Sequence, residues 1–129
     1  MADARGGGVR AAAIDDTTRN PMHHFLYRIQ PTRPEMLTEG LTEHESALVS
    51  EHFAYLQGLV ARGTVLMAGR TQDTGTRTFG VVVFVAESES AAAEVVANDP
   101  AVKHGVMRAE LFPFRVALWS PSGPPGEKG

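Results

Sequence analysis

The chain contains no cysteine, so it cannot form a disulfide framework, a thiol nucleophile or a Cys-ligated metal site. It has no excess of basic residues either. The net charge is -3 and the isoelectric point is near 5.9, which argues against nucleic acid as a partner. No apolar run is long enough to cross a bilayer, and the N-terminus lacks the apolar stretch of a secretory signal. We therefore expect no membrane association and a cytoplasmic location.

The 129 residues suffice for one hydrophobic core but not for two ordinary domains. Residues 1–21 show no sustained hydrophobic period and are predicted to form a mobile arm. Residues 119–129 are rich in Pro and Gly and are predicted to form a loose tail. The predicted folded domain is residues 22–118.

Within that domain, strand-like patterns occupy residues 23–30, 64–71, 78–86 and 106–118. A capping box at Thr42 and Glu45 opens a long helical pattern that stops at Gly63. A second helix is predicted over residues 88–98, with Ser88 or Ser90 as its cap. The order β-α-β-β-α-β predicts an α+β, ferredoxin-like fold, with two helices on one face of a four-stranded antiparallel sheet.

The segment GVVVFVA, residues 80–86, is apolar at every position instead of alternating. Such a strand is expected to be buried on both faces, although a chain of this length has no second layer to cover its sheet. We therefore predict a homodimer in which two sheets pack face to face. In the last strand, Val106, Arg108, Glu110 and Phe112 are predicted to face the space between the sheets.

His52 lies on the apolar stripe of the long helical pattern, between Val49 and Leu56. A histidine there is either a core residue with one hydrogen bond or a proton-transfer group, since imidazole titrates near pH ~6.5. Asp99 precedes Pro100, as a helix-capping residue does. A capping carboxylate still has an oxygen free to orient an imidazole, and such a pair makes a workable general acid/base.

Other polar residues are candidates for substrate binding. Arg70, at the end of the second strand, either holds an anionic oxygen of a substrate or pairs with Asp73 or Glu87. Arg108 either lines a pocket or pairs across the dimer interface. Tyr27 and Arg28 are predicted to line the pocket from the first strand. His23 and His24 lack further ligands at a recognisable metal-binding spacing, so we predict no metal site.

The segments EHFAYLQGLVARGTVLMAGRT and FGVVVFVAESESAAAEVVANDPAVKHGVMRAELFPFRVAL resemble the YCII-related proteins. The shared order is a helix His, a short Ala-Gly strand segment, Asp-Pro and a closing strand with Pro-Phe, over roughly residues 25–118. The resemblance implies a ferredoxin-like subunit, a dimeric α/β barrel and a His-Asp pair in a cleft, here His52 and Asp99. Family members often have Pro where this chain has Arg70. The segment PTRPEMLTEG, longer than in the shortest members, is a candidate lid.

The family's precedent is a dehydrochlorinase acting on a chlorinated hydroxyhydroquinone, which implies cofactor-free proton transfer. We therefore predict an acid/base enzyme of lyase, isomerase or dehydrohalogenase type acting on a small, possibly aromatic or enol-bearing molecule. His52 would move the proton and Asp99 would orient it. The alternative is a non-catalytic module that binds a small ligand or a partner protein. A metal- or haem-dependent oxygenase is a further contender, and elemental analysis of the purified protein would test it.

Overall fold

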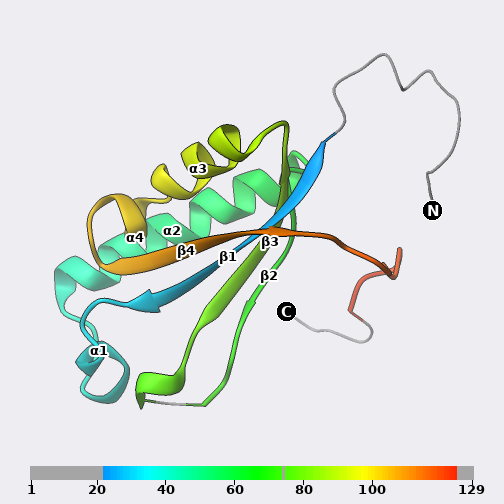
Figure 1. Ribbon diagram of the computed structural model, residues 1–129. Coiled ribbons are helices and arrows are strands. Elements are labelled where there is room, and N and C mark those ends of the chain that lie inside the picture. Colours follow the sequence, from blue (N-terminus) through cyan, green and yellow to red (C-terminus); the bar gives the residue numbers. More distant parts are fainter. Residues whose placement is uncertain (1–21, 74, 125–129) are drawn as a thin grey trace, which may run out of the picture.

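The computed structural model describes residues 22–73 and 75–124. The elements follow in the order β1 (His23–Pro31), α1 (Glu35–Thr38), α2 (Glu43–Ala61), β2 (Val65–Arg70), η2 (Gly75–Arg77), β3 (Gly80–Ala86), α3 (Glu89–Ala97), α4 (Pro100–Lys103) and β4 (Met107–Phe114). This order confirms the predicted α+β arrangement (Figure 1). The expected mobile arm, residues 1–21, and the end of the expected tail, residues 125–129, lie outside the described residues.

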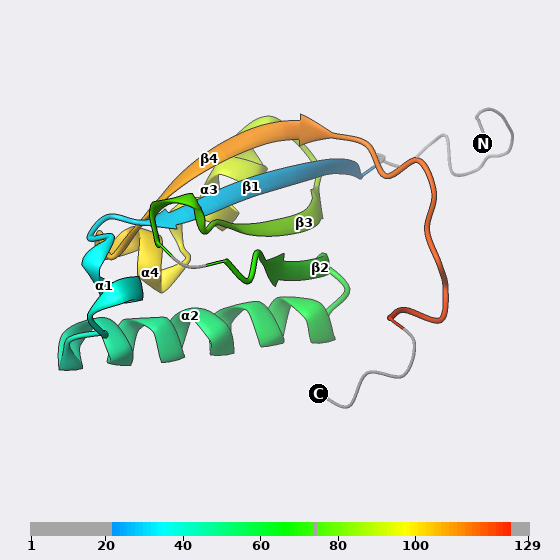
Figure 2. The same ribbon diagram turned by 90° about the horizontal axis from the view of Figure 1, so that it is seen from below.

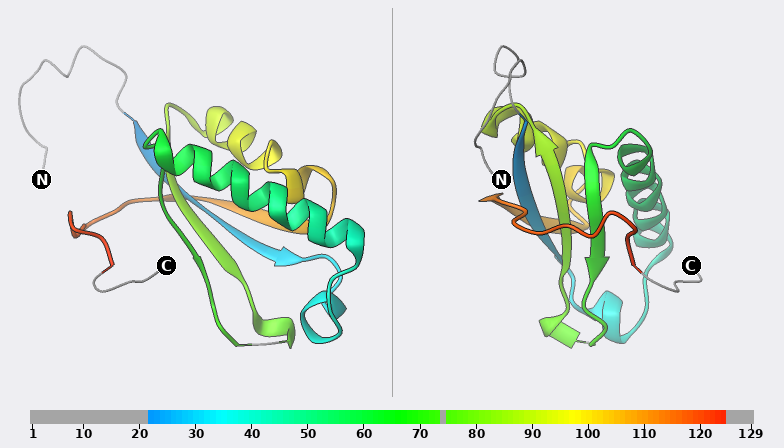
Figure 3. Two further views of the ribbon diagram at one scale, coloured as in Figure 1. Left: turned by 180° about the vertical axis from the view of Figure 1, so that it is seen from behind. Right: turned by 90° about the vertical axis from the view of Figure 1, so that its right-hand side faces the viewer.

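The four strands form one antiparallel sheet in the order β2-β3-β1-β4. The helices α2, α3 and α4 lie together on one side of the sheet (Figure 3). Strand β1 sits in the middle and alternates strictly, with Phe25, Tyr27 and Ile29 buried toward the helices. Together with Phe84 of β3 and Leu56 of α2, these side chains form the main core.

Helix α2 begins where the capping box predicts. The Thr42 hydroxyl accepts from the Glu45 N–H, and the Glu45 carboxylate accepts from the Thr42 N–H. The chain turns into β2 through Gly63, whose φ of 79° lies in the left-handed region that favours glycine. The buried side chains Leu48, Leu56 and Leu59 repeat at helical spacing, so one face of α2 packs toward the sheet.

Three details differ from the predicted elements. The candidate lid after β1, for which no helix was predicted, contains the one-turn helix α1, whose Met36 is buried. The link between β2 and β3 is longer than a hairpin turn and contains the 3-10 helix η2. Strand β2 is bulged between Val65 and Met67, because Val65 pairs with Phe84 and Met67 already pairs with Val83.

The prediction for Val106 was wrong. Val106 is buried against Met36 and Leu48 and does not face the outer side of the sheet. The reason is that β4 begins only at Met107. Val106 belongs to the turn before it, where its N–H donates to the Ala101 carbonyl at 2.9 Å.

The sheet face opposite the helices carries Leu26, Val81, Val83 and Val85. Val83 is already buried within one chain, because Leu26 and Met67 flank it on the neighbouring strands. Val81 and Val85 are half-buried. Among residues 22–73 and 75–124, no helix combines the length and apolar character that crossing a membrane requires.

Candidate active site

Helix α2 holds His52 on its buried face, in line with Leu48 and Leu56. The His52 side chain is 12% exposed, and its Nδ1 lies 2.8 Å from Oδ1 and 2.9 Å from Oδ2 of Asp99. Asp99 is the N-cap of α4 and is 0% exposed. The structure therefore brings together the two residues on which the catalytic prediction rests, although they are 47 positions apart in the sequence.

The Asp99 carboxylate has two further partners, and both are hydrogen-bond donors. The Ala101 N–H donates to Oδ1 at 3.0 Å, which caps α4. The Tyr27 hydroxyl donates to Oδ2 at 2.7 Å. Burial, and then the nearby Asp99 charge, raise the pKa of Tyr27 far above its usual range, so the hydroxyl stays protonated and keeps donating. A carboxylate surrounded by donors is stable in the buried interior as an anion.

This arrangement selects one form of the His52 ring. An ionised carboxylate accepts hydrogen bonds only, so Nδ1 carries the proton and the neutral ring has its lone pair on Nε2. Nε2 makes no hydrogen bond to another described residue. Among those residues, Nε of Arg28 is the only buried side-chain polar atom without a partner, so Nε2 is not sealed in the core. It is the atom of the pair that can meet a ligand.

His52 lines a cleft of about 1090 Å³ between α2, the β2 and β3 edge of the sheet, and the segment after β1. Figure 2 shows α2 running along β2, with α1 at the end of the helix. Most of the lining is apolar and includes Ile29, Met36, Leu37, Phe53, Leu56 and Val60. The polar side chains of the lining are His52, Gln57, Arg70, Gln72, Asp73 and Thr78. The cleft therefore joins one proton-transfer group to a largely apolar surface.

Arg70, the predicted substrate-binding residue, is among the residues that line this cleft. In the register of β2 and β3, Arg70 lies opposite Gly80 and Ala68 lies opposite Val82. Arg70 and Ala68 therefore lie on the sheet face that bears the helices. Arg70 is exposed, and within the described residues it makes no ion pair with Asp73, Glu87 or any other acid.

The structure does not bring Arg28 and Arg108 to this cleft. Strand alternation puts both on the opposite sheet face, where Arg28 pairs with Glu110 at 3.0 Å. Arg108 donates to the Pro31 carbonyl and to the Gln30 side chain, each at 3.2 Å. Within one chain these contacts tie Arg108 to β1, and its expected contact across a dimer stays a prediction.

Tyr27 also does not line the cleft. It is 0% exposed, and its role in the site is the hydrogen bond to Asp99 behind His52. Sequence reasoning missed this contact, although one signal was present. Tyr27 falls on the buried parity of its strand, and a buried tyrosine hydroxyl requires a hydrogen-bond partner.

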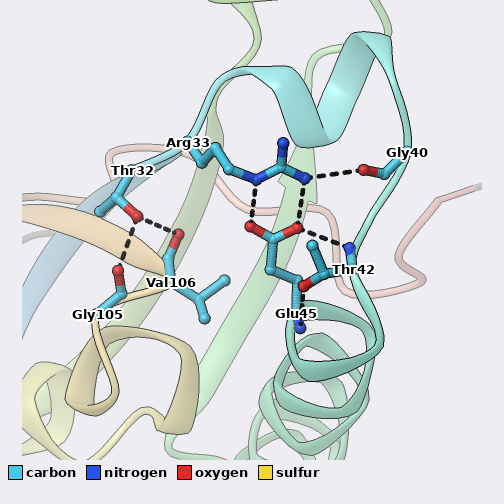
Figure 4. Close-up of polar contacts among 7 residues, drawn as sticks. All are labelled: Thr32, Arg33, Gly40, Thr42, Glu45, Gly105 and Val106. Atoms are coloured by element: carbon cyan, nitrogen blue, oxygen red, sulfur yellow. Dashed lines mark hydrogen bonds and ion pairs between the residues drawn. The ribbon is translucent and has the colours of Figure 1, made fainter.

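The segment between β1 and α2, residues 32–42, covers one end of the cleft with Met36, Leu37 and Leu41. Arg33 ties it down, as Figure 4 shows. Its Nε and one terminal nitrogen each donate to the Glu45 carboxylate at 2.7 Å, and that terminal nitrogen also donates to the Gly40 carbonyl at 2.9 Å. The predicted lid is thus fastened to the first turn of α2. We call residues 32–42 the strap.

In the part of the chain that the structure describes, no group of three or more His, Asp or Glu side chains lies close enough to hold a metal ion. Of the two histidines that open β1, His23 is exposed. His24 instead accepts a hydrogen bond from the Val116 N–H at 2.9 Å.

Comparison with known proteins identifies the family. The YCII-related domain model matches residues 25–115, whereas no curated protein matches the chain. Among solved structures, 5-chloro-2-hydroxyhydroquinone dehydrochlorinase (TftG) from Burkholderia phenoliruptrix AC1100, in complex with 2,5-dihydroxybenzoquinone, is 23% identical. Its TM-score is 0.52, over 70% of this chain and 93% of that one, and this likeness shows a shared fold.

Two weaker likenesses support no inference about function. SnoaB, a cofactor-independent oxygenase from Streptomyces nogalater, is 14% identical with a TM-score of 0.38, over 75% of this chain and 96% of that one. A monooxygenase from the gene ActVA-Orf6 of Streptomyces coelicolor is 17% identical with a TM-score of 0.39, over 77% and 93%. The family match, by contrast, spans well over half of the sequence, and this protein belongs to the YCII-related family.

Proposed function

We propose that this protein is a cofactor-free acid/base enzyme of lyase, isomerase or dehydrohalogenase type. The proposal rests on the surroundings of the His52 ring. Its Nδ1 contacts a fully buried carboxylate, and its ring lines a cleft large enough for an organic molecule. A neutral imidazole oriented in this way can act as a general base, and positioned proton transfer accelerates a reaction by about 10²–10⁴-fold.

In the proposed reaction, Nε2 of His52 removes a proton from a carbon or oxygen of the bound molecule. The imidazolium that forms is stabilised by the Asp99 carboxylate 2.8 Å from Nδ1. Arg70 neutralises the enolate or phenolate oxygen that develops on the substrate. The same imidazolium then returns the proton to another atom of the substrate, which isomerises it, or a leaving group departs with the electron pair.

The family supports a reaction of this kind, although it does not determine the substrate. A dehydrochlorinase removes the elements of HCl, and proton removal is one half of that change. The TftG likeness establishes the fold alone, so the proposed reaction type rests on the His52 site.

Hydrogen–deuterium exchange tests the proposal without knowledge of the product. The protein is incubated in D₂O with a panel of enolisable ketones, lactones, phenols and hydroxyquinones, and deuterium uptake is followed by NMR. We expect His52→Gln to reduce exchange about 10²-fold or more. Asp99→Asn, which retains a side-chain oxygen to cap α4, is expected to slow exchange while the helix still forms. If a responsive compound exchanges equally fast with wild type and His52→Gln, the acid/base proposal is wrong.

One observation favours the alternative, a non-catalytic ligand-binding or interaction module. Asp99 satisfies its carboxylate through a helix cap, a tyrosine and a histidine, which is also what a purely structural buried group requires. Under this alternative, His52→Gln lowers the thermal stability, and no compound in the panel shows exchange that depends on His52.

A further inference from the structure

The cleft is much larger than a single aromatic ring requires. A cavity of roughly 150 Å³ is enough to bind benzene, whereas sites for larger organic ligands span about 300–1,000 Å³. The cleft here measures about 1090 Å³. A one-ring molecule would leave most of it filled with water against apolar side chains, which is an unfavourable arrangement.

The mouth of the cleft carries large apolar side chains that remain exposed. Phe53 is 62% exposed, Val60 is 51% exposed and Leu41 is 45% exposed, and all three line the cleft. Phe53 and Val60 are seven residues apart on α2, so they lie on one face of the helix, and Leu41 comes from the strap. Apolar surface gathered at the mouth of a pocket is typical of a ligand-binding site. A ligand that extends from the interior to the mouth would cover all three side chains.

The charges of the lining set the polarity of one end of the ligand. Arg70 is the only Lys or Arg side chain among the described residues that line the cleft, and it makes no ion pair there. Asp73 also lines the cleft, close in sequence to Arg70, and a carboxylate at this place disfavours a ligand with several negative charges. A single anionic group is therefore favoured.

We infer that the cleft takes an elongated, mostly apolar molecule, of two or more fused or linked rings or with an alkyl extension, that ends in one anionic or enolic oxygen group held by Arg70. This inference rests on the proposed function only in treating the His52 cleft as the substrate site. The apolar body lies between α2 and β2, and the far end reaches Phe53 and Val60.

The probes are anilinonaphthalene sulfonate and N-phenylnaphthylamine, which share one multi-ring body and differ in the sulfonate. Binding is followed by fluorescence titration, with benzenesulfonate as the single-ring competitor. We expect the sulfonate probe to bind more tightly than the neutral one. Arg70→Gln is expected to weaken the sulfonate probe by about tenfold, which is the scale of one charge-assisted hydrogen bond, and the neutral probe by less than about twofold.

The location is tested by filling the cleft. Ala68 is exposed and faces the cleft, so Ala68→Phe adds a ring there without displacing packed atoms. The matched control is Ala93→Phe, at an exposed position of α3 outside the cleft. We expect Ala68→Phe to weaken both probes by about tenfold or more and Ala93→Phe to leave them unchanged. If Ala68→Phe does not fold, Val60→Trp at the mouth replaces it.

Three outcomes would overturn the inference. Equal binding by the Ala68→Phe and Ala93→Phe variants would place the probes elsewhere. If Arg70→Gln weakened both probes equally, Arg70 would not hold an anionic group of the ligand. If benzenesulfonate bound as tightly as the larger sulfonate probe, the cleft would not require a ligand of more than one ring. If wild type binds both probes as expected but promotes no proton exchange in any compound of the panel, the proposed function is wrong and this inference stands.

Discussion

At the scale of single residues, the least accessible part of the site is the most informative. Tyr27 never reaches the cleft, yet its hydroxyl shares the Asp99 carboxylate with His52. Each donor that binds the carboxylate lessens the charge that it offers to the imidazole. Tyr27 is therefore a positioning residue, which acts on the proton-transfer group through Asp99.

Tyr27→Phe removes this donor while keeping the ring in the core. We expect the free energy of unfolding to fall by about 1–3 kcal/mol, because a buried acceptor loses its partner. We also expect the pH–rate profile of proton exchange to change, since the Asp99 carboxylate then meets the imidazole with one hydrogen-bond donor fewer. Urea denaturation and the exchange assay measure the two effects.

The raised pKa of Tyr27 also predicts how the stability difference between Tyr27→Phe and wild type depends on pH. The pKa in the folded protein lies above the ordinary value of 10.0, so its contribution to stability is complete below pH 10 and is lost as the pH rises above it. As the pH rises above 10, the free energy of unfolding should therefore fall less in Tyr27→Phe than in wild type. The control is Tyr55→Phe, whose hydroxyl donates to the Val95 carbonyl at 2.6 Å and which should leave the pH–rate profile in place. An unchanged profile in Tyr27→Phe would contradict a positioning role.

At this scale the sequence predicts the residues that local patterns mark, but not the contacts between residues that are far apart in the sequence. His52 stood out because a titratable ring on an apolar helix face is a local pattern, and Asp99 because Asp-Pro is a local capping signal. The contact of Tyr27 with Asp99 joins residues 72 positions apart and depends on how α4 meets β1. Tyr27 and Arg28 cannot line the same pocket, because neighbouring strand residues face opposite sides of the sheet.

At the scale of elements, the strap is the part whose position the sequence did not predict. The capping box could be predicted from the sequence, because Thr42 and Glu45 stand at the three-residue spacing that defines it. The use of the same Glu45 carboxylate by Arg33 was not visible, since Arg33 lies twelve positions away across a loop and a short helix. Glu45 thus joins the start of α2 to the cover of the cleft.

Glu45→Gln should loosen the strap. Hydrogen bonds from the Arg33 guanidinium, which has the largest effect, and from the Thr42 N–H lower the pKa of Glu45 to about 2. A carboxyl whose folded pKa is lowered contributes stability that is present above its ordinary value of 4.5 and is lost as the pH falls toward 2. We therefore expect Glu45→Gln to lower the Tm at pH 7 by several degrees, and the difference from wild type to shrink between about pH 4.5 and pH 2.

The matched control is Glu43→Gln, which removes an exposed acid from the same first turn of α2. Scanning calorimetry over the pH range compares the two variants with wild type. Hydrogen exchange of the strap amides should speed up in Glu45→Gln and stay unchanged in Glu43→Gln. If both variants lose the same stability at every pH, the effect of Glu45 is general helix electrostatics and the strap is not held by Arg33.

At the scale of the whole molecule, the order of elements was predictable because hydrophobic period, caps and glycine stops all agree on it. The resemblance implied a cleft at His52 and Asp99, but its size and lining were not predictable, because they depend on the distance between α2 and the bulged β2. The apolar run in β3 indicated that both sheet faces are buried. Within one chain this holds for Val83 but not for Val81 and Val85, so the second layer of the predicted homodimer stays a prediction.

The outer sheet face supports that prediction, since Phe112 is 42% and Phe114 is 43% exposed on β4. We expect light scattering after size exclusion to give twice the 13.8 kDa of one chain. Phe112→Glu, which would bury an unpaired charge between the sheets, should raise the dissociation constant by about 100-fold or more. The control, Phe53→Glu, adds the same charge at the cleft mouth on the other side of the sheet. A monomeric wild type at about 100 μM, or equal effects of the two variants, would show that a second copy does not cover this face.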